Sequence, residues 1–290
     1  MIRYDSIREI QELLERYKCS PQKKWGQNFM ISQHARKRIC SLAGIEPGET
    51  VWEIGPGIGS LTALLVKNAA RICVFEIDSI FIKILNDQFG NYENFVCIPG
   101  NFLKTWESVY KESHPDKIIG NLPYNSGSMM IGRLIEKRVC PAKMVFTVQK
   151  EVADRMVASP GSKNYSVFSL ICQFRFRVSL KGELKPGTFY PQPKVNSSIV
   201  EFSPCSNYSD QINSTVFFQL VHDAFRSRRK TLKNNLLGGN VIRTFGRELL
   251  FTAVMENGID YNARGETLSL EDFVSIVRRI SPRDNNELQT

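Results

Sequence analysis

The chain has no apolar run approaching the roughly 18 to 20 residues that cross a membrane, and no positively charged N-terminus leading into a hydrophobic stretch. We therefore expect a cytoplasmic protein rather than a membrane or secreted one. The seven cysteines contain no C-x-x-C pair and no metal-ligand spacing, which favours free thiols in a reducing compartment. The three histidines are scattered and form neither a triad nor a metal set. We expect no metal.

The chain does carry enough apolar material for a full core, together with an excess of positive charge. At 290 residues with 42% hydrophobic content, it is long enough for one large domain and a smaller one. Its net charge of +9 and pI near 9.2 suit a phosphate backbone as partner. Cations gather at Lys23 and Lys24, at 36–38 and over 226–233. A solvated basic face is the alternative interpretation of each cluster.

Apolar and helical patterns alternate along the first two thirds of the chain. Strands are expected near 50–55, 71–77, 95–99, 116–122 and 143–149, with helices near 59–69, 79–89 and 127–138. This alternation predicts a doubly wound parallel sheet of the α/β class. Prolines predict an edge or hairpin strand over 191–202.

The ends of the chain differ from this α/β pattern. A helical period over 5–17 precedes it, and after a polar stretch at 205–210 only helical periods follow, near 213–226, 229–237, 245–256 and 270–280. We predict an N-terminal helical extension at 1–20, an α/β domain at 21–204 and a small all-helical domain at 205–290.

A glycine turn at Gly55-Pro56-Gly57-Ile58-Gly59 follows the first expected strand. The dinucleotide pattern G-x-G-x-x-G needs glycine or alanine where this chain has Ser60, which weakens an NAD interpretation. The pattern E-x-G-x-G-x-G, which starts at Glu53, resembles the S-adenosylmethionine (SAM) site of Rossmann-like methyltransferases. The next strand ends at Glu76, where a carboxylate can accept hydrogen bonds from a ribose. A tight turn without a ligand is the alternative.

The segment Asn121–Asn125 follows a short apolar run that predicts a central strand. Pro123 has no N–H and cannot continue the ladder, so the chain leaves the sheet there. Ligands of open α/β sheets bind outside the carboxyl ends of strands, so Asn121 and Tyr124 are expected to face a crevice. Carbonyl oxygens beside an aromatic face suit the exocyclic amine of a base. An ordinary strand-to-turn junction is the alternative.

Six segments together resemble one family, the rRNA adenine N6,N6-dimethyltransferases, and within it the small-subunit branch associated with kasugamycin sensitivity. The resemblance covers about residues 20–280. It implies a monomer that uses SAM to dimethylate two adjacent adenosines near the 3′ end of 16S rRNA, within the small ribosomal subunit or its precursor, as a step of ribosome biogenesis. The six segments are GQNFM from 26, EIGPG from 53, GNLPYN from 120, QKEV from 149, FYPQPKV from 189 and FRSRRKTL from 225.

The resemblance also assigns residues to the cofactor. Asn28 and Met30 would close over its methionine end, Gly55 would line its amino-acid part, and Glu76 would hold the ribose. The family usually has Asp at the position of Asn101, which would accept from the adenine amine without charge, at a cost of about 1 kcal/mol. The expected cofactor set is Asn28, Met30, Gly55, Gly57, Gly59, Glu76, Ile77, Asn101, Phe102 and Asn121.

Chemistry on the base is expected at the end of the fourth predicted strand. The Asn121 side-chain oxygen and a carbonyl of Leu122 or Pro123 would accept the N–H groups of the adenine amine and aim its lone pair at the sulfonium methyl, with no titrating base. Tyr124 and Phe189 would stack on the base. The expected catalytic set is Asn121, Leu122, Pro123 and Tyr124, and the expected RNA-binding set is Lys23, Lys24, Arg226, Arg228, Arg229, Lys230 and Lys233.

Three alternatives remain open. A large-subunit 23S rRNA adenine methyltransferase of the erythromycin-resistance type would share the SAM and Asn-Leu-Pro-Tyr features, but the segments at 191–195 and 228–231 favour the small-subunit enzyme. A non-catalytic binding protein, such as an assembly factor or a mitochondrial transcription factor, is a second alternative. A DNA adenine methyltransferase is the third.

Overall fold

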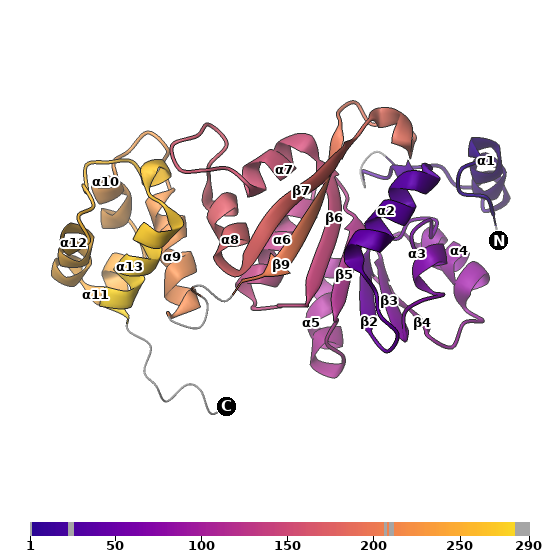
Figure 1. Ribbon diagram of the computed structural model, residues 1–290, viewed down its shortest axis with the longest axis horizontal. Coiled ribbons are helices and arrows are strands. Elements are labelled where there is room, and N and C mark those ends of the chain that lie inside the picture. The colour runs from indigo at the N-terminus through magenta and orange to yellow at the C-terminus, as the bar shows by residue number, and fades with distance from the viewer. Residues whose placement is uncertain (1, 23–25, 206–207, 209–211, 282–290) are drawn as a thin grey trace. The chain divides into compact units, whose positions relative to one another are not determined.

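Seven strands form one sheet in the order β4-β3-β2-β5-β6-β9-β7 (Figure 1). The structure is a computed structural model that describes residues 2–22, 26–205, 208 and 212–281. β2 to β6 are parallel to one another, while β9 runs antiparallel to β6. The Rossmann-like α/β class is therefore confirmed, with an antiparallel addition to the parallel sheet. The strands are β2 (Thr50–Ile54), β3 (Arg71–Glu76), β4 (Phe95–Pro99), β5 (Lys117–Asn121), β6 (Lys143–Gln149), β7 (Phe176–Leu184) and β9 (Ser197–Pro204).

Seven helices in the described ranges have an N-cap side chain that accepts from a free backbone N–H of the first turn. The helix expected near 59–69 forms only four residues, and α2 and α5 go beyond the sequence prediction. α5 carries apolar residues at helical spacing and buries two of them, Phe102 and Trp106. None of the helices in the described ranges is long and apolar enough to span a membrane. They are α1 (Ile7–Arg16), α2 (Gln33–Ala43), α3 (Thr62–Leu65), α4 (Ser79–Phe89), α5 (Phe102–Glu112), α6 (Gly127–Glu136), α7 (Lys150–Met156) and α8 (Val167–Arg175).

The strand predicted over 191–202 is not at the edge of the sheet. β9 lies between β6 and β7, and its side chains Ile199, Val200 and Phe202 are fully buried. The prolines at 191 and 193 precede the strand, and Pro204 ends it. They therefore remove no N–H from the interior of the ladder. Of the two predicted alternatives the edge strand is wrong, whereas the hairpin alternative agrees with the place of β9 beside β7, the preceding strand of the same sheet.

A short two-stranded antiparallel sheet joins two segments that are far apart in the sequence. β1 (Phe29–Met30) pairs antiparallel with β8 (Phe189–Tyr190). The N–H of Ile31 also donates to the carbonyl of Thr188 at 2.9 Å. These bonds hold the segment around Asn28 against the loop that precedes β9.

The chain divides into two compact units. The first comprises 1–133, 140–153 and 178–204, and the second comprises 134–139, 154–177 and 205–290. In the second, the rings of Phe174 and Phe217 stack with centroids 4.0 Å apart. Our domain limits at 20 and 204 stay predictions, and most of the expected linker at 205–210 lies outside the described residues. The C-terminal helices are α9 (Ser214–Ala224), α10 (Leu232–Leu237), α11 (Val241–Phe245), α12 (Arg247–Glu256) and α13 (Leu270–Ile280), of which α11 goes beyond the prediction.

Gly59 closes the glycine turn against α4. Its φ is +87°, and a Cβ there would lie 2.4 Å from the Phe89 ring and 3.1 Å from Leu85. A contact that short forces a core ring to move. Packing of the turn, as well as its backbone conformation, therefore requires glycine at this position.

We expect Gly59→Ala to lower the free energy of unfolding by about 1–3 kcal/mol more than Gly48→Ala does. Gly48 is a matched control, because its φ is +98° and no atom lies within 4 Å of the added Cβ. Denaturant unfolding of both variants measures the difference. If both variants lose the same free energy of unfolding, the Phe89 ring can move aside at no cost, and only the backbone conformation requires glycine.

Candidate active site

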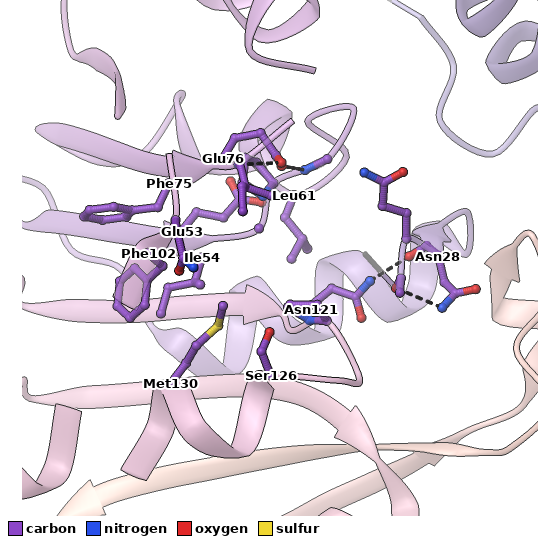
Figure 2. Close-up of a pocket in the computed structure, with 18 of the residues that line it drawn as sticks. Asn28, Glu53, Ile54, Leu61, Phe75, Glu76, Phe102, Asn121, Ser126 and Met130 are labelled. Carbon is purple, nitrogen blue, oxygen red and sulfur yellow. Dashed lines mark hydrogen bonds between the residues drawn. The ribbon is translucent and has the colours of Figure 1, made fainter. Parts of the chain in front are cut away.

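A cavity of about 250 Å³ opens at the carboxyl ends of the parallel strands. Its walls come from the residues that follow β2, β3, β4 and β5, from the 26–30 segment and from the start of α6. Figure 2 shows Asn28 and Asn121 on one side of it, Glu76 on another, and Ser126 and Met130 from the start of α6. This is the crevice that the strand-end argument predicts.

Glu76 ties the glycine turn to the end of β3. One carboxylate oxygen accepts from the N–H groups of Ile77 at 2.8 Å and Asp78 at 2.9 Å, and the other accepts from Gly57 at 3.0 Å. Burial raises the pKa of Glu76, and these three amide bonds oppose that rise. A carboxylate has about four acceptor positions, so one remains for a ligand hydroxyl.

Glu53 is a second buried carboxyl group in the cavity wall. Its Oε2 accepts from the Thr62 hydroxyl at 2.6 Å. Burial raises its pKa to about 8, against the opposing effect of the Thr62 bond, and the nearby Glu76 raises it further. Glu53 is therefore largely protonated at neutral pH, which leaves Glu76 as the carboxylate of this wall that the backbone stabilises in its charged form.

Asn121 presents an acceptor atom with no partner. Its Nδ2 donates to the backbone carbonyl of Asn28 at 2.8 Å (Figure 2), whereas its Oδ1 is buried and forms no hydrogen bond with any described residue. A buried, unpaired amide oxygen costs about 1–3 kcal/mol. Because the residue lines the cavity, a ligand N–H donor would satisfy it.

The second acceptor expected for the adenine amine is the carbonyl of either Leu122 or Pro123, and the hydrogen bonds distinguish the two. The Pro123 oxygen already accepts from the N–H groups of Ser126 at 3.2 Å and Gly127 at 2.9 Å, at the turn into α6. Both of its lone pairs are thus engaged. Leu122, whose side chain is buried, donates its N–H to Thr147. Of these two carbonyls, only that of Leu122 keeps its acceptor capacity.

The two aromatic residues predicted to stack on the base, Tyr124 and Phe189, lie in different environments. The Tyr124 hydroxyl forms a 2.7 Å hydrogen bond with Ser197 Oγ at the start of β9, and burial raises its pKa. Tyr124 lies outside the set of residues that line the cavity. Phe189 is only 1% exposed and belongs to β8, so it offers no free face in this arrangement. Its stacking role stays a prediction that requires the β1–β8 sheet to open.

Nine of the ten predicted cofactor residues line the cavity, and Gly59 does not. A Cβ added at Gly59 would meet Phe89, and the assignment of Gly59 as a cofactor contact stays a prediction. The oxygen of Asn101 accepts from the Leu103 N–H at 3.0 Å as the N-cap of α5. Asn101 therefore keeps its NH₂ group as a donor, together with one remaining lone pair on that oxygen. The nine lining residues are Asn28, Met30, Gly55, Gly57, Glu76, Ile77, Asn101, Phe102 and Asn121.

Some lining residues carry no signal in the sequence. Ser126 and Met130 face the cavity only because α6 starts directly after the Asn121–Asn125 turn. Gln27 is a further wall residue, and its side chain bridges the Gln22 N–H and the Asp78 carboxylate. Ser197 does not line the cavity but holds the Tyr124 hydroxyl, and its only signal in the sequence is its position after the FYPQPKV segment.

The basic segment of the helical unit is held by a buried amide. Asn235 donates to the carbonyls of Ala224 at 2.7 Å and Ser227 at 3.0 Å, and it accepts from the Ser227 N–H. Arg228 is paired with Glu266, so part of its charge is already balanced. Arg226, Arg229 and Lys230 are exposed, while Lys233 is half-buried. Lys23 and Lys24 lie outside the described residues.

The Rossmann-like sheet, the glycine turn and the acidic strand end define a SAM-dependent methyltransferase. The chain belongs to the ribosomal RNA adenine dimethylase family, whose model matches residues 19–281. It is 38% identical to the ribosomal RNA small subunit methyltransferase A of Borreliella burgdorferi, covering 95% of this chain and 94% of the relative. It is also 38% identical to the Treponema denticola protein of the same name, covering 93% of each chain.

Solved structures share the fold. A dimethyladenosine transferase from Plasmodium falciparum matches with a TM-score of 0.69 and 26% identity, covering 84% of this chain and 94% of that one. The 23S rRNA methyltransferase ErmE matches with a TM-score of 0.63 and 20% identity, covering 87% and 99%. At that identity the second match speaks for the fold alone.

We expect the free energy of unfolding to contain a Glu53 contribution that is lost as pH rises. Unfolded glutamate ionises near pH 4.5, whereas folded Glu53 holds its proton to about pH 8, so the unfolded state gains stability through this window. Glu53→Gln should remove a few kcal/mol of the difference in stability between about pH 5 and about pH 8. Denaturant unfolding at both values measures it.

Glu112→Gln provides the matched control, because it makes the same substitution at an exposed carboxyl group on α5. A Glu53→Gln variant with the parental slope would mean that the folded protein ionises Glu53 well below pH 8.

Proposed function

We propose that this chain transfers methyl groups from SAM to the N6 amines of two adjacent adenosines near the 3′ end of 16S rRNA. The observation that carries the proposal is the buried Asn121 Oδ1, an acceptor without a partner in the wall of the strand-end cavity. An exocyclic amine is a donor of matching polarity. The small-subunit names of the curated relatives support the choice of RNA.

The residues present fit SAM as the cofactor. Three backbone N–H groups occupy three of the four acceptor positions of the Glu76 carboxylate, so one position remains for a ribose hydroxyl. Gly57 has φ +58°, a backbone conformation that favours glycine, and a Cβ there would lie 3.2 Å from the Phe29 ring, which would have to shift. When bound, SAM supplies a methyl group activated by its sulfonium.

The chain contributes positioning and neutral acceptors rather than a base. An adenine amine is a weak nucleophile, because its lone pair is delocalised into the ring. Asn121 Oδ1 and the Leu122 carbonyl would each accept one N–H, which turns the nitrogen towards a tetrahedral shape and aims its lone pair. Positioning alone supplies up to roughly 7–11 kcal/mol in the best intramolecular systems. The same oxygens stabilise the positive charge that develops on nitrogen.

Tyr124 is suited to hold the base while its amine lies between Asn121 Oδ1 and the Leu122 carbonyl. Its hydroxyl is anchored by Ser197, so the ring orientation is set before the substrate arrives. Stacking of a base on an aromatic ring contributes about 1–3 kcal/mol. The adenosine must leave its own stack to reach the cavity, as base-modifying enzymes require.

The helical unit, with its basic segment, would hold the rRNA without taking part in chemistry. We further propose that the protein acts as a monomer in the cytoplasm and uses no metal, as a step of ribosome biogenesis. In the stretches that the structure describes, no group of three or more His, Cys, Asp or Glu side chains is arranged to hold a metal ion.

A non-catalytic rRNA-binding assembly factor is the second candidate function. It would need the basic surface but not an acceptor kept buried and unpaired at Asn121, which is costly to retain without a donor. A large-subunit enzyme has the same site chemistry, so the two rRNA substrates must be compared directly.

Asn101→Asp should tighten SAM binding about five-fold. The aspartate would keep the N-cap of α5 with one oxygen and turn the free NH₂ donor into an acceptor for the adenine amine. Asn101→Ser is the matched control, since it retains the cap without a second polar atom. Calorimetric titration with SAM measures both. Weaker binding of SAM to the Asp variant than to the parent would remove Asn101 from the adenine site.

Asn121→Ala should lower turnover by about 10²–10³-fold, because an acceptor aimed at the transition state is lost. Its SAM affinity should change little by comparison. Mass spectrometry of rRNA from immature small subunits treated with the enzyme counts mono- and dimethyladenosine. Asn68→Ala removes an amide whose side chain bonds only its own helical turn and should methylate at the parental rate.

Labelled SAM with large subunits and with DNA tests the alternatives in the same assay. Methyl transfer to large subunits in preference to small ones would replace the proposed substrate. Parental turnover by Asn121→Ala would overturn the catalytic assignment.

A further inference from the structure

A second hollow, of about 450 Å³, lies in the helical unit. Two half-buried aromatic rings line it, Phe251 on α12 and Tyr261 in the loop that follows, with centroids 6.3 Å apart and planes at 75°. Lys233 Nζ lies 5.1 Å from the Tyr261 ring centroid, and the Arg247 guanidinium lies 5.9 Å from that of Phe251. Each ring therefore carries a cation at its face.

Backbone bonds hold these elements together. The Lys233 N–H donates to the Tyr261 carbonyl at 2.9 Å, and the Leu232 N–H donates to that of Ala263 at 2.7 Å. The aromatic loop is thus fixed against the start of α10. At the other side α12 begins at Arg247 after Gly246, with no side chain capping its first N–H groups. Those free donors add to the positive potential of the hollow.

The cations of the hollow differ from other cations of the helical unit. Arg228, Arg278 and Arg279 each pair with a glutamate. Lys233 and Arg247 form no ion pair with any residue in the described ranges. Glu248 also lines the hollow; it provides an acceptor for a ribose hydroxyl or an exocyclic amine. The set thus offers two aromatic faces, two unpaired cations and one acceptor.

We propose that this hollow binds one unpaired nucleotide of an RNA strand, with the base stacked on one of the two rings, Tyr261 or Phe251, beside the other, and the phosphate on Lys233 and Arg247. Aromatic faces with interleaved cations are how proteins take single-stranded nucleic acid without reading its sequence. Bases in a helix offer no face, so the site selects loops and ends. The inference rests on the proposed function only in taking RNA as the partner.

Photocrosslinking of the unmodified full-length chain tests the site directly. The probe is a short single-stranded oligouridylate that carries 5-iodouridine, which crosslinks to aromatic side chains that stack on it. Peptide mapping should place the crosslink at Phe251 or Tyr261, and a double-stranded RNA of the same length should not compete. Crosslinks confined to other peptides would overturn the proposal.

Affinity measurements give a second and independent test. Phe251→Leu and Tyr261→Leu should each weaken binding of the oligouridylate about ten-fold. Lys233→Ala and Arg247→Ala should each reduce the salt dependence by about one ion. Phe245→Leu is the matched control, since Phe245 is half-buried on α11 but does not line the hollow. Binding by both aromatic variants at the level of this control would overturn the proposal.

The two proposals fail in different ways. A chain that methylates 16S rRNA but binds the oligouridylate elsewhere refutes the hollow and leaves the enzyme intact. A chain that crosslinks at Tyr261 but forms no dimethyladenosine retains the nucleotide site and loses the catalytic assignment.

Discussion

The hydrogen bond from Asn121 Nδ2 to the Asn28 carbonyl decides which end of the amide is left for a ligand. An amide has one donor end and one acceptor end, so satisfying the donor within the protein leaves the oxygen for the substrate. The bond also links the 26–30 segment to the end of β5. That segment is in turn held by the β1–β8 pairing, so the polarity of the catalytic acceptor depends on contacts outside the central sheet.

A close backbone approach brings the two halves of the site together. A Cβ on Gly120 would lie 2.6 Å from the Ile54 carbonyl, so β5 can lie beside β2 only with glycine there. The glycine turn after β2 and the Asn121 turn after β5 consequently meet at one edge. SAM chemistry needs methyl donor and acceptor amine within a few ångströms, and this approach of two strands provides the geometry.

Local patterns predict most of the site, while tertiary contacts decide the rest. The glycine turn, Glu76 and Asn121 follow from strand–turn–helix patterns, because cofactor sites in such sheets lie at strand ends. The sequence does not distinguish the role of Gly59 from that of Gly55 and Gly57. The Phe89 ring, which leaves no room for a Cβ at Gly59, is 30 residues away in the chain. The interior position of β9 was equally hidden, because prolines outside a strand resemble prolines within an edge strand. The donor left on Asn101 depends on its place as the N-cap of α5. The sequence prediction missed this helix, although its apolar residues recur at helical spacing.

The energetics of the reaction explain why a methyltransferase site of this kind needs a basic partner surface. Flipping a base out of its stack costs a few kcal/mol, whereas neutral acceptors such as Asn121 Oδ1 and the Leu122 carbonyl each contribute about 1 kcal/mol net in the ground state. Their larger effect is reserved for the charged transition state. The free energy that holds the RNA must therefore come from contacts with no role in chemistry, and phosphate-binding cations and stacking rings supply it without depending on the target base.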